Sequence, residues 1–345
     1  MIIHRSLASS LFNLFLSIFL LTLISCQQQK NTLDFMAMNT YMRVQVYSKS
    51  DWKSQEKAQA ILQECKSEII NLENQLSTTI PTSDVYKLNN LHELNPQVHP
   101  CVLELLDFSR TMYKKTDGAF NPSLYPVIRE WGFTTGDYKI PSQEKIAELL
   151  QYTDFNKVDV PLPQNMQLDF GAIGKGYAGD KVLELLRQKG ITSALLDFGG
   201  NIQTLGTKPD GSLWNVGIKN PWDNSSVICS VSIDSKAVIT SGGYERFFTG
   251  ADGKKYIHIF DSKTGCPCES DLESVTIVTQ SGTYADALST SLYVMGKENA
   301  INFWKNNFDF DFILITKDLE LLYSAGLKDF VKPLYDSLKV SLISR

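Results

Sequence analysis

Residues 169–180 read DFGAIGKGYAGD, and positions 174–179 within them spell a literal G-x-G-x-x-G. A glycine pattern of this kind, placed between a strand and a helix, forms the phosphate-binding turn of dinucleotide-binding folds. In that interpretation MQLDF (166–170) is the strand, residues 175–189 form the helix and SALLDF (193–198) is the second strand. The rest of the sequence must show whether the chain has a doubly wound parallel fold or another architecture.

Three features argue against the dinucleotide interpretation. Gly-Ala-Ile at 171–173 separates the candidate strand from the first glycine, which in such folds makes the turn directly. Lys175 occupies the variable position between the first two glycines, where a long cation is unusual. The motif also lies in the middle of the chain, surrounded by runs typical of a mixed sheet. It is not a Walker A motif either, because G-x-x-x-x-G-K-[ST] is not matched.

The same stretch still suits a phosphate group. Small residues let backbone N–H groups approach an anion closely, and the start of a helix adds a favourable dipole. Lys175 supplies a point charge. The alternative is a strand-to-helix turn whose glycines allow tight packing and whose lysine is exposed.

The order of predicted elements favours an α+β fold. Apolar spacing predicts helices in the first half, whereas short β-rich runs with two inserted helices dominate from residue 156 onward. This order predicts an N-terminal helical part and then a mostly antiparallel mixed sheet with inserted helices, not regular βαβ alternation. The predicted helices are 53–76, 99–116, 142–152, 175–189, 283–296 and 327–339, and the predicted strands are 41–47, 156–160, 166–170, 193–198, 213–219, 226–233, 237–242, 255–260, 274–279 and 310–316.

The first residues predict export. Residues 1–25 combine Arg5, a short apolar core and small residues, a pattern that describes a signal peptide rather than a membrane span. LISC, which ends at Cys26, is similar to the bacterial lipobox, whose cysteine takes a diacylglycerol; a plain secretory signal with an incidental cysteine is the alternative. Residues 26–33 are then a polar tether, and residues 34–345 form the folded part. The predicted protein is exported, lipid-anchored to a bacterial membrane and faces the periplasm.

Charge and cysteine content argue against several classes of protein. The net charge is −5 and the basic residues form no long run, which argues against nucleic-acid binding. Of six cysteines, five follow Cys26, and an odd number argues against a full disulfide framework. Cys266 and Cys268 lie too close together for a zinc knuckle, and with four histidines in the chain a zinc site is not expected.

Six motifs follow one another along the chain. They are FMAMNTYMRV (35–44), DFGAIGKGYAGD (169–180), LLDFGGNI (195–202), AVITSGGYERFF (237–248), HIFDSKTG (258–265) and TYADALSTSLYVMG (283–296). Together they resemble the ApbE family, the flavin transferases that move FMN from FAD onto a protein, and the resemblance extends from about residue 35 to 325. It implies an ApbE-like α+β fold, with residues 34–345 as a single catalytic domain or two lobes that hold FAD between them.

The resemblance also implies the reaction and its partners. The expected activity is Mg²⁺-dependent transfer of FMN from FAD to a threonine hydroxyl of a target protein, with release of AMP. FAD is the substrate, and flavin-accepting redox proteins of the envelope are the expected partners. His258 in HIFDSKTG matches a family histidine near the reacting phosphate, where it could act as a general base. The alternative is a structural histidine on an alternating strand.

Two residues of YADALST have the chemistry of a magnesium site. Asp286 and Thr290 lie four residues apart on a predicted helix, hence on one face. A carboxylate and a hydroxyl are hard oxygen ligands that suit Mg²⁺ rather than zinc. The resemblance implies that they bind Mg²⁺ together with the backbone carbonyl of Ala172. Without it, Asp286 is equally a charge near a helix N-terminus and Thr290 a hydroxyl on a helix face.

The remaining predicted site residues follow from matching motifs. Lys175 is expected to hold the diphosphate and Asp169 the adenosine or ribose part of FAD, whereas Arg246 is assigned only to shaping the site. The other residues expected to contact FAD are Met38, Ala119, Phe120, Asn121 and Ile259. Asn121 stands where the family usually has aspartate, which keeps hydrogen bonding but removes a charge.

Thr79 is a departure from the family pattern. The family commonly has a tyrosine facing the flavin at this point, and some relatives with a non-aromatic residue here act mainly as FAD pyrophosphatases that yield FMN and AMP. Mg²⁺-dependent FAD hydrolysis is therefore the first alternative function. A non-catalytic FAD-binding lipoprotein is the second, and a dinucleotide-dependent oxidoreductase is the third.

Overall fold

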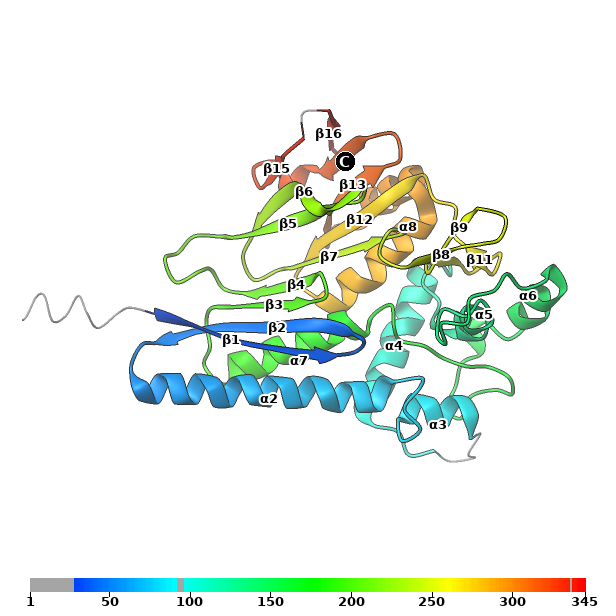
Figure 1. The fold of residues 1–345 in the computed structure, drawn as a ribbon, viewed down its shortest axis with the longest axis horizontal. Coiled ribbons are helices and arrows are strands. Elements are labelled where there is room, and N and C mark those ends of the chain that lie inside the picture. The colour runs from blue at the N-terminus through cyan, green and yellow to red at the C-terminus, as the bar shows by residue number, and fades with distance from the viewer. Residues whose placement is uncertain (1–27, 92–95, 336) are drawn as a thin grey trace, which may run out of the picture.

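The computed structural model describes residues 28–91, 96–335 and 337–345 (Figure 1). The helices are α2 (Trp52–Leu76), α3 (Asp84–Asn90), α4 (Pro100–Lys115), α5 (Tyr125–Glu130), α6 (Gln143–Leu150), α7 (Gly174–Gln188) and α8 (Gly282–Lys305). The strands are β1 (Gln28–Ala37), β2 (Thr40–Lys49), β3 (Ala194–Phe198), β4 (Asn201–Leu205), β5 (Trp214–Asn220), β6 (Asp223–Ile233), β7 (Ala237–Gly242), β8 (Phe247–Thr249), β9 (Lys255–Ile257), β10 (Phe260–Asp261), β11 (Cys266–Pro267), β12 (Leu272–Thr279), β13 (Asp311–Thr316), β14 (Glu320–Ser324), β15 (Val331–Pro333) and β16 (Lys339–Ile343).

A nine-stranded sheet organises the fold. Its strand order is β1-β2-β3-β4-β7-β12-β13-β14-β16, from the lower edge of Figure 1 to the top. Neighbouring strands pair antiparallel except β14 and β16, which run parallel. The predicted α+β class with a mostly antiparallel mixed sheet is confirmed. Three of the antiparallel pairs, β1–β2, β3–β4 and β13–β14, are joined by short turns, which parallel strands could not use.

The glycine-rich stretch does not belong to a dinucleotide-binding unit. Residues 166–170, the candidate first strand, lie in no strand of the structure. After α7 the chain enters β3, which pairs antiparallel with both β2 and β4. A dinucleotide-binding turn requires a parallel βαβ unit around its helix, and this arrangement excludes one here.

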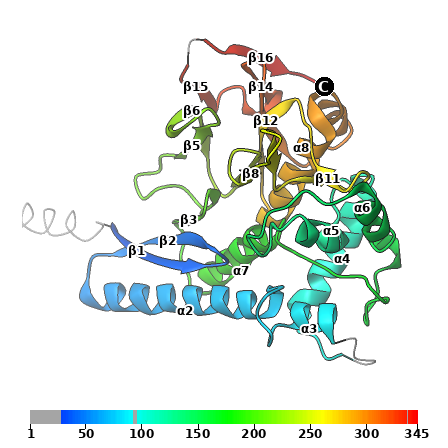
Figure 2. The same ribbon diagram turned by 45° about the vertical axis from the view of Figure 1, so that its right-hand side comes forward.

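The large sheet lies between two layers. Helices α2, α7 and α8 cover one face, and the three-stranded sheet β15-β6-β5 covers part of the other (Figures 1 and 2). Alternating residues of each strand supply the two cores: Leu196 and Ile277 point to the helical layer, Leu195 and Val278 to the smaller sheet. Helices α2 and α4 share the core of the large sheet.

Helix α2 shows how the sequence dictates its local structure. Asp51 caps its N-terminus, because the carboxylate accepts hydrogen bonds from the Ser54 N–H at 3.0 Å and the Ser54 hydroxyl at 2.6 Å. The buried positions recur at helical spacing, so that one face packs on β1, β2 and α7. The helix ends at Leu76, and its last turn reaches the tip of the β1–β2 hairpin.

Four predictions about individual segments were wrong. Residues 28–33, predicted as part of a tether, belong to β1, which pairs with β2 along its whole length. Residues 156–160 and 166–170 lie in no strand, because their apolar side chains fill the core from irregular backbone. Residues 327–339, predicted as a helix, contain β15 and the start of β16.

Cys266 and Cys268 are both free thiols and do not pair with each other. Cys266 packs beside α6, and Cys268 packs against the main core. The predicted signal peptide (1–25) and Cys26 lie outside the described residues. Among the residues that the structure does describe, no helix is both long and apolar enough to cross a membrane.

Candidate active site

The N-termini of α7 and α8 cross at two glycines. A Cβ on Gly176 would overlap the carbonyl oxygen of Gly282 and lie 2.9 Å from the Cβ of Asp286. The close approach lets the Gly176 N–H donate to Asp286 Oδ2 at 2.9 Å. The glycine-rich stretch is therefore a packing motif, and through that packing it brings the start of one helix onto a carboxylate of the other.

This contact leaves an oxygen free before α7. The N–H of Gly174 reaches Phe170 O and that of Tyr177 reaches Ile173 O. In a continuous helix the Gly176 N–H would reach Ala172 O, but Asp286 takes it, and Ala172 O accepts no backbone hydrogen bond within the described residues. A carbonyl oxygen without a partner thus lies on the same turn that Asp286 contacts.

Thr290 lies one turn after Asp286 on α8, as the spacing predicted. Its Oγ1 is 3.2 Å from Ser241 Oγ on β7, and Ser241 Oγ is 2.8 Å from Ser289 Oγ. Thr290 is half-buried whereas Asp286 is only 4% exposed. The helix therefore presents a deep carboxylate and a shallower hydroxyl along one line.

Burial and charge act on Asp286 in opposite directions. Burial raises the pKa of its carboxyl, while the Lys175 charge, the Gly176 N–H and the Asn201 amide lower it. Asp180, a second carboxylate nearby, raises it. Within the described residues, no group of three or more His, Cys, Asp or Glu side chains is placed to hold a metal ion. A cation at Asp286 would therefore also need hydroxyl and carbonyl oxygens.

The structure fixes the tautomer of His258. Both its backbone N–H, at 3.1 Å, and its ring Nδ1, at 3.0 Å, are bonded to the carbonyl oxygen of Arg246. Because a carbonyl can only accept, Nδ1 must carry the proton, and Nε2 is left with a free lone pair. Burial lowers the pKa of His258 to about 4, and the charges of Arg246 and Lys175 act in the same direction. The imidazole is neutral at pH 7 and can accept a proton at Nε2.

The β8–β9 hairpin holds this histidine in place. Its register pairs Phe247 with Ile257, so Arg246 and His258 form the base of the hairpin. The Arg246 guanidinium donates to Phe133 O. Stacked rings anchor the hairpin to the loop after α5, at centroid distances of 4.9 and 5.2 Å; they are Tyr138, Phe248 and Tyr256.

Asp169 joins the same group from the other side. Its carboxylate accepts the Gly171 N–H at 2.8 Å, and its own N–H donates to Pro122 O at 2.9 Å. Burial raises the pKa of Asp169, and the Gly171 N–H, Arg246 and Lys175 lower it. Lys175 therefore acts electrostatically on Asp169, His258 and Asp286, and makes no hydrogen bond or ion pair of its own with the described residues.

A second group lies at the tip of the β1–β2 hairpin. Met38 and Asn39 form its two-residue turn with positive φ angles of 47° and 57°, and the Met38 N–H donates to Glu73 Oε1 at 2.8 Å. Glu73 lies in the last turn of α2, and Thr79 follows in the next loop. Thr79 is exposed, with its Oγ1 3.1 Å from Ser77 Oγ. Sequence-distant Met38 and Thr79 are thereby brought to one end of the molecule.

The segment at residues 119–121 is also predicted to contact FAD. Phe120 is 2% exposed and packs in the main core. Asn121 Nδ2 donates to Thr153 O, and its Oδ1 accepts from both the N–H and the hydroxyl of Ser123. Ala119 is half-buried. The side chains of Phe120 and Asn121 are therefore engaged inside the protein.

Ile259 has a similar structural setting. Its side chain is buried in the main core and its carbonyl accepts the Cys268 N–H at 2.8 Å. Its neighbour His258 is thus held on both sides, by Arg246 before it and by a buried residue after it. Contact of Ile259, or of residues 119–121, with FAD stays a prediction.

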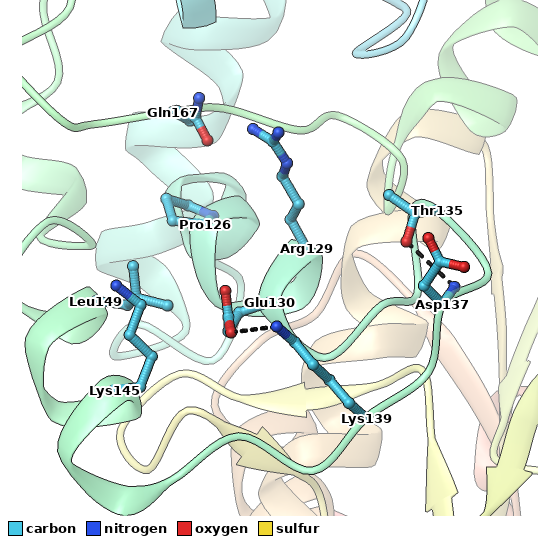
Figure 3. A pocket seen from close by; sticks show the side chains of 9 residues that line it. All are labelled: Pro126, Arg129, Glu130, Thr135, Asp137, Lys139, Lys145, Leu149 and Gln167. Atoms are coloured by element: carbon cyan, nitrogen blue, oxygen red, sulfur yellow. Dashed lines mark hydrogen bonds and ion pairs between the residues drawn. The ribbon is translucent and has the colours of Figure 1, made fainter.

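A polar hollow of about 410 Å³ lies away from these groups (Figure 3). Glu130 and Lys139 pair across it at 2.6 Å, and the Asp137 N–H donates to Thr135 Oγ1 at 3.2 Å. None of the predicted site residues lines it; those that do are Pro126, Arg129, Glu130, Thr135, Asp137, Lys139, Lys145, Leu149 and Gln167. The hollow is therefore not the site that the sequence predicted.

Several residues that build the site carried no signal in the sequence. Glu73 holds the Met38 turn, and Asn89 bonds both the N–H and the carbonyl of Leu168, the residue directly before Asp169. Gln203 Nε2 donates to Gly176 O at 2.9 Å. Each lies far in sequence from the residue that it supports, so no local spacing could have revealed it.

Comparison with known proteins shows which family the chain resembles. The family model for "ApbE family" matches residues 38–314. The chain is 34% identical over 322 residues to the FAD:protein FMN transferase of Treponema pallidum (strain Nichols), which covers 87% of this chain and 88% of that protein. It is 31% identical over 278 residues to a protein of the same name from Klebsiella pneumoniae (strain 342), covering 78% and 86%.

Solved structures show the same relationship. The ApbE protein of Thermotoga maritima superimposes with a TM-score of 0.77 at 30% identity, covering 88% of this chain and 99% of that one. The apo form of the flavinyl transferase ApbE of Pseudomonas stutzeri gives 0.73 at 29% identity, covering 84% and 92%. The resemblance seen in the six motifs is confirmed over most of the chain, and the protein belongs to the ApbE family.

Proposed function

We propose that this protein transfers the FMN part of FAD to a threonine hydroxyl of a target protein and releases AMP. The observation that carries the proposal is the convergence of Lys175, His258 and Asp286 at the start of α7. The names of the relatives, FAD:protein FMN transferase, support the same chemistry. A helix N-terminus with an unpaired lysine suits a diphosphate.

The proton acceptor is His258 Nε2. The threonine oxygen attacks the phosphorus on the FMN side, its proton passes to Nε2, and the bond from that phosphorus to the bridging oxygen breaks, so AMP leaves with the bridging oxygen. Hydrogen bonding of Nδ1 to Arg246 O holds the ring in the required tautomer and orientation. Lys175 stabilises the negative charge on the diphosphate, and Asp169 is placed to bind the adenosine or ribose part.

The residues at the α7–α8 crossing fit Mg²⁺. Asp286 is a buried carboxylate without an ion pair in the described part of the chain, Ala172 O lacks a backbone partner, and Thr290 offers a half-buried hydroxyl. Three hard oxygens of this kind are the donor set that Mg²⁺ prefers. When bound, Mg²⁺ would neutralise charge that builds on the diphosphate oxygens. Asp286, Thr290 and Ala172 are the residues that would hold it.

FAD hydrolysis is the second candidate function. It is favoured by Thr79, which is exposed on the same end as Met38 and offers no aromatic ring to the flavin. Water would then take the place of the threonine hydroxyl, and the products would be FMN and AMP. The same His258 and Asp286 would serve both reactions.

The location of the protein follows from its first residues alone. LISC supports lipid attachment at Cys26, outside the described residues, and hence a protein anchored to a bacterial membrane and facing the periplasm. Flavin-carrying redox proteins of the envelope would be its acceptors. A mass shift of the mature protein equal to a diacylglyceryl group, absent in Cys26→Ser, would support this placement.

Transfer and hydrolysis are separated by following both products. The chain from Gln27 is incubated with FAD and Mg²⁺, with and without a domain carrying a candidate threonine flavinylation motif. AMP together with an acceptor mass gain of one FMN would support transfer. AMP and free FMN with an unchanged acceptor would support hydrolysis. Absence of AMP under both conditions, with Mg²⁺ in excess, would contradict any catalytic role and leave an FAD-binding protein.

A further inference from the structure

One carboxylate collects the free donors at the start of α8. Asp180, on α7, accepts the Gly282 N–H at 2.7 Å and the Thr283 N–H at 2.9 Å. It also accepts the hydroxyl groups of Thr283, at 2.7 Å, and of Ser281, at 2.9 Å. The first N–H groups of a helix have no partner within it, so a carboxylate at this place satisfies them and complements the helix dipole.

The arrangement is reciprocal. Asp180 on α7 binds the N-terminus of α8, and Asp286 on α8 binds the Gly176 N–H at the N-terminus of α7. The helices touch at Gly176 and Gly282, where neither side has room for a Cβ. Asp286 lies four residues after Gly282, so its distance from the Asp180 contact is fixed by a single helical turn.

We propose that Asp180 is a positioning residue that holds α8 in the one axial place and rotation at which Asp286 and Thr290 face the Ala172 carbonyl. Without its four hydrogen bonds, the first turn of α8 can slide or fray. A small displacement there moves Asp286 away from the Gly176 N–H and separates the three oxygens. The inference rests on the proposed function only in taking these oxygens as the cation site.

A purely structural helix cap would behave differently. Asp51 is such a cap: it holds the first turn of α2 through Ser54, at the end of that helix away from the Met38 turn. Loss of either aspartate removes side-chain hydrogen bonds from the first turn of a helix and lowers stability. Only loss of Asp180 should also weaken cation binding. Asp51→Ala is therefore a matched control for Asp180→Ala.

The test measures cation binding directly and does not depend on turnover. Full-length protein in detergent, as wild type, Asp180→Ala, Asp180→Asn and Asp51→Ala, is titrated with Mn²⁺ in the presence of FAD, and free Mn²⁺ is read by electron paramagnetic resonance. Both Asp180 variants should bind Mn²⁺ about 10- to 100-fold more weakly, the range seen when a residue supporting a metal ligand is lost. FAD binding without metal should change less than about twofold. Asp51→Ala should match wild type in both.

The outcomes are separable. Unchanged Mn²⁺ affinity in folded Asp180→Ala, or equal weakening in Asp51→Ala, would overturn the inference. Should Asp180→Ala not fold, Thr283→Ala removes one hydroxyl bond to Asp180 and Ser281→Ala removes another together with the N-cap bond to the Tyr284 N–H. Both should weaken Mn²⁺ binding in the same direction by a smaller factor, and no change in either would overturn the inference. Wild type that binds Mn²⁺ but releases no AMP would contradict the proposed function alone. Wild type that binds no Mn²⁺ would overturn the positioning role as well.

Discussion

The two ends of the candidate site are built on different principles. At the α7–α8 crossing, Gly176, Asp180 and Asp286 lie in close contact, and each of the two carboxylates accepts backbone N–H groups from the other helix. At the tip of the β1–β2 hairpin, the hydrogen bonds within the described residues are fewer: the Met38 N–H donates to Glu73, and Thr79 bonds to Ser77 beside it.

The two regions differ in how well they tolerate substitution. Buried groups at the crossing cannot move without leaving a polar atom unpaired, which costs about 1–3 kcal/mol each. Exposed side chains at the hairpin tip can be exchanged at almost no cost in stability. In the proposed reaction the crossing therefore acts on the phosphate, whereas the hairpin end sets which nucleophile completes the reaction.

Gly176→Ala is the strongest way to break the crossing. Its Cβ would overlap a backbone oxygen, which cannot rotate away, so the helices must separate. We expect no measurable AMP release and a loss of about 1–3 kcal/mol or more in the free energy of unfolding, measured by urea denaturation. Gly174→Ala is the matched control for stability, because a Cβ there meets nothing within 4 Å; it should be neutral or slightly stabilising. Equal stability of the two variants would contradict the packing role of Gly176.

His258→Gln tests the proton acceptor within a site that stays assembled. Glutamine can still donate to Arg246 O but cannot take up a proton. AMP release in the presence of the acceptor should fall about 10²- to 10⁴-fold, the usual contribution of a general base. FAD affinity, measured by flavin fluorescence, should change little. A rate within threefold of wild type would remove His258 from the chemistry.

The same histidine gives the protein a predictable pH dependence. Its pKa is about 4 in the folded protein against an ordinary value of 6.5, so the folded state disfavours the proton. Above pH 6.5 the histidine is neutral in both the folded and the unfolded protein, and full stability is retained. As the pH falls from 6.5 to about 4, the unfolded protein takes up a proton that the folded protein does not, so stability is lost. Over that window wild type should lose roughly 3 kcal/mol of unfolding free energy relative to His258→Gln. A constant difference between the two proteins would show that His258 is not held neutral.

Helices and strands could be predicted from the sequence better than the contacts between residues that are distant in the sequence. β2 and α2 followed from alternation and helical spacing, because each buries one full face. β1 was missed because its first residues are polar; as an edge strand it is held by pairing with β2 rather than by burial of both faces. β16 was missed for the same reason. Asp286 and Thr290 were predicted as metal ligands from the family resemblance, with their spacing placing them on one helix face, whereas the contacts of Asp180 could be recognised only once the two helices were seen to cross.

Thr79→Tyr is expected to have the smallest effect and to sharpen the comparison most. A ring at this exposed position can stack on the flavin, an interaction worth about 0.5–1.5 kcal/mol, and so exclude water from the reacting phosphorus. The ratio of FMN transferred to FMN released should rise about 2- to 10-fold, while total AMP release and the melting temperature stay as in wild type. Thr82→Tyr, exposed in the same loop, is the control and should leave the ratio unchanged. If both variants shift the ratio equally, any added aromatic surface suffices; if neither does, the choice between water and threonine is made elsewhere than at the hairpin end.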